Sequence, residues 1–225
     1  MNNLSFVETA DGSNTIFNAS VGENYHSHHG AFQESQHVFL RSGLEYFLSQ
    51  HNTTAVKILE VGFGTGLNFL LTADFCTLNN IQLHYTGIEA FPLTQDIIFN
   101  TGYNKYVSSE LWQSYQEHYF NAFDKSVSLT SSVNLSIAPR KLLEFTTSDT
   151  FDILYFDAFA VRYQPEMWND ESLEYICRFL KTGGVFVTYA ITGNLKRSLK
   201  KLGFAIQKIP GAPGKREMLR AIKEC

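Results

Sequence analysis

Three glycines, each separated by a single residue, follow a short apolar run and form the first chemically informative stretch of the sequence. The stretch reads EVGFGTGLNF, with Glu60 in front of Gly62, Gly64 and Gly66. An apolar strand, a glycine turn and a helix start in this order let a nucleotide approach the backbone closely. The alternative interpretation is that the glycines only provide a tight corner between two elements.

The glycine spacing and the preceding acid distinguish between two classes of nucleotide cofactor. The dinucleotide fingerprint G-x-G-x-x-G needs a third glycine at the position of Leu67. A carboxylate at Glu60 repels a pyrophosphate but suits the sulfonium and ammonium groups of S-adenosylmethionine. Glu89, at the end of the next apolar run, can accept hydrogen bonds from ribose hydroxyls. These residues favour S-adenosylmethionine, and a dinucleotide-dependent oxidoreductase is the alternative.

Alternating elements along the chain must position these residues. Apolar runs predict strands at residues 56–62, 81–91, 151–159 and 185–190, and a strand followed by a turn at 133–145. Apolar spacing and capping residues predict helices at 33–50, 68–77, 169–182 and 194–203, with a helical insertion at about 93–123. Residues 204–210 and 216–223 are expected to form a closing antiparallel strand pair.

This alternation predicts an α/β fold of the Rossmann-like type, with a mostly parallel, doubly wound sheet and a C-terminal antiparallel strand. We expect a single domain over residues 1–225. Residues 1–54 would form an N-terminal extension that contains a short hairpin, and residues 55–225 would form the core. Ligands of such sheets bind beyond the carboxyl ends of the strands, where Glu60, Glu89 and Asp157 would meet.

Charge is distributed unevenly along the 225 residues. The net charge is −4, but residues 180–225 contain ten Lys or Arg against two acids, so this segment carries +8 and the remainder −12. Such asymmetry can mark a phosphate-facing surface. A solvated basic helix face is the alternative interpretation.

The composition also argues against several classes of protein. No apolar run approaches the roughly 20 residues of a membrane span, and the N-terminus lacks a basic and apolar leader. Three cysteines lie far apart, which is not typical of a disulfide framework or a zinc site. His26, His28 and His29 have no acids or cysteines at ligand spacing, so we expect no metal. A cytoplasmic protein without a membrane partner is expected.

Six motifs resemble one known family in content and in order. They are GFGTGLNFL, EAFPLT, FDAFA, PEMW, LKTGGVFVTY and GKREML. This order is similar to the methyltransferase domain of the bifunctional tRNA 5-methylaminomethyl-2-thiouridine biosynthesis protein, MnmC, from about residue 17 to 219. The resemblance implies an S-adenosylmethionine-dependent enzyme that methylates the 5-aminomethyl group of a wobble (2-thio)uridine in the anticodon region of tRNA. The family's FAD domain is missing, so we expect coupling to a separate FAD-dependent demodification or aminomethyl-forming enzyme.

The resemblance assigns roles to individual residues. Asp157 matches the active-site acid, with Phe159 beside it, and both are the expected catalytic residues. The expected cofactor-binding residues are Glu60, Gly62, Phe63, Gly64, Gly66, Asn68, Glu89 and Asp157. The expected RNA contacts are Lys196, Arg197, Lys215 and Arg216, the last two from the family's K-R-E-M motif.

Two departures from the family pattern affect these assignments. Val161 stands where the family motif continues with Pro. Ala138 and Pro139 stand where the family usually has an Asp suited to the adenine amino group. Adenine must then be held by backbone groups or by packing, for which Phe91 is one aromatic side chain in reach.

The expected chemistry is methyl transfer to an amine. A primary alkyl amine is mostly protonated at pH 7, so the site must help it lose a proton and orient its lone pair. Asp157 is the candidate for this role. Its structural alternative is an acid bonded to the N-terminus of the helix that follows. The alternative functions are methylation of another amine substrate and RNA binding without catalysis.

Overall fold

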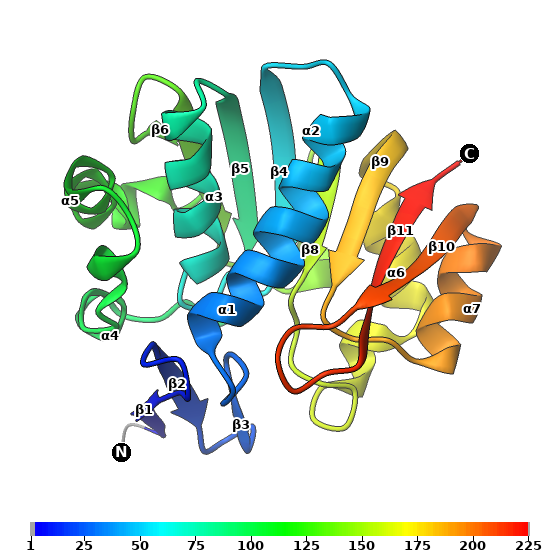
Figure 1. The fold of residues 1–225 in the computed structure, drawn as a ribbon, viewed down its shortest axis with the longest axis horizontal. Coiled ribbons are helices and arrows are strands. Elements are labelled where there is room, and N and C mark those ends of the chain that lie inside the picture. Colours follow the sequence, from blue (N-terminus) through cyan, green and yellow to red (C-terminus); the bar gives the residue numbers. More distant parts are fainter. Residues whose placement is uncertain (1–2, 225) are drawn as a thin grey trace.

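An eight-stranded sheet forms the centre of the computed structural model, which describes residues 3–224 (Figure 1). Across the sheet the strands follow the order β10 (Phe204–Pro210), β11 (Glu217–Lys223), β9 (Leu180–Thr188), β8 (Phe151–Phe156), β4 (Ala55–Val61), β5 (Gln82–Ile88), β7 (Val133–Ala138) and β6 (Val127–Ser128). The five strands β9, β8, β4, β5 and β7 are parallel to one another, and the short β6 is antiparallel to β7. Strand β11 lies between β9 and β10 and is antiparallel to both. The predicted parallel sheet with an antiparallel C-terminal strand is confirmed.

Helices cover both faces of this sheet. They are α1 (Ala31–Ser35), which continues through a π-helical segment at Gln36–Glu45 into α2 (Tyr46–Gln50), then α3 (Leu67–Leu78), α4 (Gln95–Phe99), α5 (Ser109–His118), α6 (Asp170–Cys177) and α7 (Gly193–Lys201). Figure 1 shows the α1–α2 helix crossing one face of the sheet beside α3. That face packs around Tyr85 and Tyr155, and the opposite face, with α6 and α7, packs around Phe156 and Phe186. Among residues 3–224, no helix has the length and apolar character to cross a membrane.

The segment before α1 forms a small sheet of its own. Its strands are β1 (Leu4–Glu8), β2 (Asn14–Asn18) and β3 (Glu23–Asn24), and all pairs are antiparallel. Figure 1 shows this sheet below the start of α1, on the side of the large sheet to which the arrows of β5 and β9 point. The hairpin expected in this region is therefore present as β1 and β2, and the sequence did not indicate β3.

Two predicted elements differ from the structure. The helix expected at 169–182 ends at Cys177, because residues from Leu180 onward pair with β8, which makes Gly183 and Gly184 part of β9. Long-range strand pairing has overridden the local helical pattern there. The insertion at 93–123 divides into α4, α5 and two short 3₁₀ turns. The expected cap is confirmed, since the Asn169 side chain accepts a hydrogen bond from the backbone N–H of Ser172 at 2.8 Å.

Candidate active site

A cavity of about 1400 Å³ opens beyond the carboxyl ends of β4, β5 and β8. Its wall includes the glycine turn after β4, the loop after β5 and the loop after β8, which is the arrangement expected for an open parallel sheet. Residues 20–29 of the N-terminal segment complete the opposite side. The site is therefore built from both the core and the N-terminal extension.

Gly62 places the glycine turn directly against the end of β8. Its φ is +84°, and a Cβ there would lie 2.3 Å from the carbonyl oxygen of Asp157. The backbone N–H of Asp157 donates to the carbonyl of Val61 at 2.9 Å. No residue with a side chain fits this backbone contact without a shift, so the glycine is needed for Asp157 to reach the cavity.

Glu89 stands at the carboxyl end of β5 with its carboxylate fixed by the backbone. Its Oε2 accepts from the Gly64 N–H at 2.8 Å, and its Oε1 accepts from the Phe91 N–H at 3.0 Å. Burial raises the pKa of Glu89. Each carboxylate oxygen can accept further hydrogen bonds, and Glu89 lines the cavity, so it can bind a pair of hydroxyls. Phe91 beside it is 74% exposed and offers a ring face to a planar ligand.

Glu60 does not face the cavity, contrary to the expectation that it meets a cationic ligand. It is completely buried, its Oε1 accepts from Asn68 Nδ2 and its Oε2 accepts from the Tyr85 hydroxyl, each at 2.8 Å. Strand β4 is buried on both faces, so residue alternation could not reveal which way Glu60 points. Burial raises the pKa of Glu60 well above its ordinary value.

The structure also does not place three other expected cofactor-binding side chains for direct contact with a ligand in the cavity: Asn68, Gly66 and Phe63. Asn68 lies behind the cavity wall, and its Nδ2 also donates to Asp157 Oδ2 at 2.8 Å. Gly66 has a φ of +78° and precedes α3, where it packs under Phe63. The Phe63 ring is buried against Gly87, so Phe63 lines the cavity with little more than its backbone. Gly62 and Gly64 remain in the cavity wall as expected.

Asp157 follows the last residue of β8 and lines the cavity, with Phe159 two residues further. Burial, followed by the negative charge of Glu34, raises the pKa of Asp157 to about 8, although the Asn68 hydrogen bond and the Lys215 ammonium act in the opposite direction. The alternative role of capping the next helix is not what the side chain does, because its hydrogen bond is to Asn68. A carboxyl group with this pKa can exchange a proton with an amine near neutral pH.

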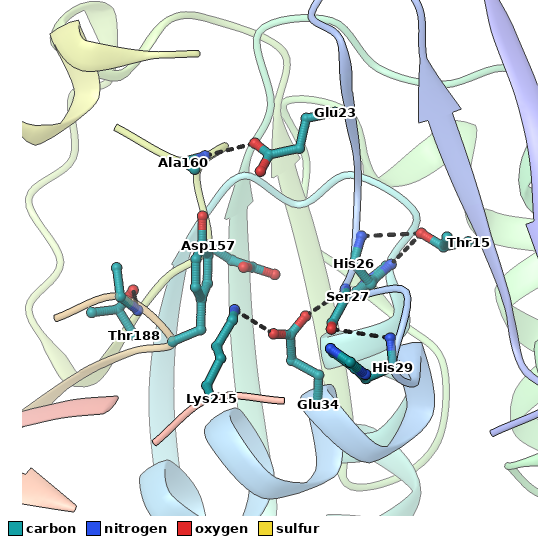
Figure 2. Close-up of polar contacts among 12 residues, drawn as sticks. Thr15, Glu23, His26, Ser27, His29, Glu34, Asp157, Ala160, Thr188 and Lys215 are labelled. Atoms are coloured by element: carbon teal, nitrogen blue, oxygen red, sulfur yellow. Dashed lines mark hydrogen bonds and ion pairs between the residues drawn. The ribbon is translucent and has the colours of Figure 1, made fainter. Parts of the chain in front are cut away.

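Lys215 was expected on the RNA-facing surface, but it lies inside the site. Its ammonium donates to Glu34 Oε1 at 2.7 Å and lies 3.7 Å from the centre of the Tyr189 ring. Figure 2 shows Lys215 and Glu34 pointing toward one another close to Asp157. No local sequence pattern indicates this ion pair, because the two residues are 181 positions apart.

Other cations of the basic C-terminal segment also serve the fold. Lys181 pairs with Asp152, Lys201 pairs with Asp170, and Lys223 donates to two backbone carbonyls. Arg220 donates to Gln207 and lies 3.4 Å from the centre of the Tyr46 ring. Arg197 and Arg216 are exposed and Lys196 is half-buried, so these three remain at the surface. The charge excess of the segment overstates the charge that is free to meet a phosphate.

Three contacts attach the N-terminal segment to the cavity. Glu23 Oε2 accepts from the Ala160 N–H at 2.8 Å, as Figure 2 shows. The Tyr25 ring packs edge-on against Phe159, with ring centres 5.1 Å apart. Glu34 accepts both Lys215 and the Ser27 N–H. Sequence reasoning missed Glu23, Tyr25 and Glu34 as site residues because each acts through a partner far along the chain.

The histidines near this wall have structural contacts. His26 is buried and its backbone N–H donates to the Thr15 hydroxyl at 3.0 Å, and burial lowers the pKa of His26 to about 4. His28 and His29 lie against one another with ring centres 4.0 Å apart. Within residues 3–224, no cluster of three or more His, Cys, Asp or Glu side chains is arranged to hold a metal.

The charges of the cavity wall favour a cationic ligand. Seven acids line it, against four Lys or Arg: Glu23, Glu34, Glu89, Glu144, Asp157, Glu166 and Glu171, and Arg140, Lys141, Arg162 and Lys215. An excess of acids over cations in the wall attracts a sulfonium or an ammonium and repels a phosphate. After β7, residues 140–144 line the cavity, whereas Ala138 is buried in the sheet.

Comparison with known proteins agrees with this geometry. The family described as S-adenosyl-L-methionine-dependent methyltransferase matches residues 106–224, and the chain belongs to this family. This is therefore an S-adenosylmethionine-dependent methyltransferase, and the dinucleotide alternative is overturned. It is 32% identical to the tRNA 5-methylaminomethyl-2-thiouridine biosynthesis bifunctional protein MnmC of Magnetococcus marinus over 87% of this chain. It is also 32% identical to MnmC of Campylobacter hominis over 92% of this chain. The resemblance seen in the motifs is confirmed.

The similarity to the curated relatives covers only part of each relative. The chain spans about a third of the length of the curated relatives, 30% for the Magnetococcus protein and 31% for the Campylobacter protein. The crystal structure of MNMC2 from Aquifex aeolicus superposes with a TM-score of 0.80 and 22% identity, covering all of this chain and 72% of that one. The sugar N-methyltransferase KedS8 from Streptoalloteichus superposes with a TM-score of 0.52 and 11% identity, covering 86% of this chain and 87% of that one. Both confirm the fold.

The cavity fits the cofactor of this family. Glu89, held by two backbone N–H groups, would bind the ribose hydroxyls, and Gly62 and Gly64 would allow close approach of the amino-acid part. Phe91 and Leu143, both exposed at the cavity, would pack on adenine in place of the missing acid. When bound, S-adenosylmethionine supplies an electrophilic methyl group on a sulfonium.

Proposed function

We propose that this enzyme methylates the nitrogen of the 5-aminomethyl group on a wobble (2-thio)uridine in the anticodon region of tRNA, forming the 5-methylaminomethyl derivative. The observation that carries the proposal is the acid-rich cavity with Asp157 at its floor, because this wall suits an ammonium substrate. The printed names of the curated relatives give the substrate class.

Asp157 performs the central step in this proposal. The substrate enters as an ammonium, and its charge lowers the pKa of Asp157, so that an ion pair forms in the cavity. One N–H proton passes to the Asp157 carboxylate, and a hydrogen bond from one of the two remaining N–H groups orients the nitrogen lone pair toward the methyl group that the cofactor would supply. Phe159 packs beside Asp157 against Tyr25 and limits water access. The new N–C bond replaces the methyl–sulfur bond of the cofactor, which would leave as a neutral thioether; the product is a secondary ammonium, and Asp157 returns its proton to water.

Uridine recognition requires the base to leave the anticodon stack. Sequence-specific proteins bind such splayed bases against aromatic rings. Tyr25, Phe159 and Tyr163 all line the cavity, and Arg162 lies 4.4 Å from the centre of the Tyr163 ring. These side chains favour a flat, uncharged ring next to the amine pocket.

The backbone of the RNA would bind outside the acidic cavity. Lys196 and Arg197 on α7 and the exposed Arg216 are the proposed phosphate contacts, whereas Lys215 is removed from this set by its ion pair with Glu34. The aminomethyl substrate would come from a separate FAD-dependent or aminomethyl-forming enzyme. A tRNA substrate also places the enzyme in the cytoplasm in this proposal.

Mass spectrometry of nucleosides tests the proposal. tRNA bearing 5-aminomethyluridine is incubated with enzyme and methyl donor, and a mass increase of one methyl group on that nucleoside is expected. Asp157→Asn, which keeps the size of the side chain, should abolish the increase. Transfer to a small-molecule amine with unchanged tRNA would favour the alternative substrate, and tRNA binding without any transfer would favour a non-catalytic relative.

A charge-reversal series tests the RNA surface separately. Lys196→Glu with Arg197→Glu should weaken tRNA binding strongly at low salt, because such contacts release counterions from the phosphate backbone. Lys105→Glu, an exposed cation between α4 and α5, is the matched control. Equal affinities for both variants and for the wild type would remove α7 from the interface.

A further inference from the structure

We propose that Asn68 is a positioning residue that holds the Asp157 carboxylate for the amine. The inference rests on the proposed function only in the use of Asp157 as the group that meets the substrate nitrogen. Asn68 lies at the second position of α3, behind the cavity wall, and Asp157 follows β8, so the contact joins two elements 89 residues apart.

The Asn68 amide donates to two carboxyl groups from a single nitrogen. Its Nδ2 lies 2.8 Å from Glu60 Oε1 and 2.8 Å from Asp157 Oδ2, so both amide hydrogens are used. Glu60 is fixed on its other oxygen by the Tyr85 hydroxyl. The result is a buried row of hydrogen-bonded side chains, Tyr85–Glu60–Asn68–Asp157, that fixes Asp157 Oδ2. Asp157 Oδ1 accepts no hydrogen bond from residues 3–224 and is available for a substrate N–H.

The amide oxygen shows that packing alone does not explain this residue. Asn68 is 4% exposed, and its Oδ1 is buried without a hydrogen-bond partner among the described residues. An unpaired buried acceptor is unfavourable, and an apolar side chain of equal size would avoid it. The two donated hydrogen bonds are therefore the feature for which this position needs an amide.

Charged groups from several elements act on Asp157, whereas its hydrogen-bond donor Asn68 is neutral. Glu60 approaches from β4, Glu34 from α1 and Glu23 from β3. A negative charge on any of the three disfavours ionisation of Asp157. Lys215, from the loop before β11, favours the ionised form of Asp157. The Tyr189 side chain, which follows β9, also lies close enough to Asp157 for their charges to interact. Because acids outnumber cations here, the donated hydrogen bond is needed to keep the ionised form within reach of neutral pH.

Two variants and one matched control test this role without substrate. Asn68→Leu removes both donors at nearly equal size, and Asn68→Asp replaces the amide with a further acid. Thr72→Val lies one turn along α3, is equally buried and loses only a long contact to the Tyr155 hydroxyl. Carbon-13 NMR follows the Asp157 carboxyl as a function of pH, with Asp157→Asn identifying its resonance.

The titration midpoint of Asp157 should rise in both Asn68 variants by roughly one to two pH units, the value of one hydrogen bond to a charged group. It should not move in Thr72→Val. If Asn68→Leu does not fold, Asn68→Ala, which also removes both donors without adding a charge, gives the same comparison. An unchanged midpoint in the Asn68 variants, or an equal rise in Thr72→Val, would overturn the proposal.

The pH dependence of kcat provides the second readout. Asn68→Leu should lose roughly tenfold or more at pH 7.5 and recover most of this loss at higher pH, as Asp157 ionises. A purely structural role would reduce kcat equally at every pH and overturn the proposal. Because the NMR titration needs no tRNA, failure of the proposed substrate and failure of the Asn68 inference give different results.

Discussion

Replacing Asp157 with Asn should stabilise the folded protein by an amount that depends on pH. Burial raises the pKa of Asp157 from its ordinary 3.8 to about 8. The native state therefore keeps this proton up to about pH 8, whereas the unfolded chain releases it near pH 4. Between these values the native state binds more protons than the unfolded chain, so wild-type stability falls as pH rises.

The size of the effect follows from the difference of about four pH units. Each unit corresponds to about 1.4 kcal/mol, which gives an upper limit of roughly 6 kcal/mol. Asp157 borders an open cavity, so water reduces this to about 2–3 kcal/mol. Asp157→Asn cannot ionise, and its stability relative to wild type should increase from pH 5 to pH 9 and level off above that.

Urea unfolding of wild type and Asp157→Asn at pH 5, 7 and 9 measures this difference. Glu8→Gln, at an exposed position in β1, is the control for loss of one carboxyl group. A stability difference between Asp157→Asn and wild type that is the same at all three pH values would refute the reasoning, because Asp157 would then titrate alike in both states. A difference that falls with pH would refute it as well, since it requires a lowered pKa.

Four further substitutions give separate expectations. Lys215→Met should lower the free energy of unfolding by about 2 kcal/mol in urea, because it leaves the buried Glu34 without its cation. Glu34→Gln should lower it by about half as much, because the partly exposed Lys215 can reach water. Glu89→Gln should weaken binding of S-adenosylhomocysteine about tenfold in calorimetry, since the amide loses acceptor capacity toward hydroxyls. Gly62→Ala should lower the melting temperature by about 5 °C or more, because of its φ of +84° and the contact with the Asp157 carbonyl.

The fold and the cofactor class were predictable because both depend on local patterns. Apolar runs separated by helical spacing place β4, β5 and β8, and the G-x-G-x-G turn follows β4 in the sequence itself. The direction of Glu60 was not predictable, because β4 is buried on both faces and both orientations bury equal apolar surface. The sequence placed the acid at the correct strand end but on the wrong side of the cavity wall.

The second half of the cavity could not be read from the sequence for a different reason. Glu34 and Lys215 meet across 181 residues, and Glu23 meets Ala160 across 137 residues. Neither contact leaves a periodic or spacing signal, because each depends on how the N-terminal segment packs on the finished sheet. The KREM motif identified Lys215 as important, but only the ion pair with Glu34 shows that its charge acts inside the site.

The proposed reaction needs a site for cationic reactants and a separate surface for the anionic RNA backbone, and charge in this protein is distributed to suit both. The cavity wall is acidic, which attracts a sulfonium and an ammonium and keeps phosphate out. The proposed phosphate contacts, Lys196 and Arg197 on α7 and the exposed Arg216, are not among the residues that line that wall. In the proposed complex, an RNA bound there would place a base and its aminomethyl group in the cavity and keep its phosphates outside. Methyl transfer would thus be restricted to a nitrogen that carries positive charge and lies several bonds from the nearest phosphate.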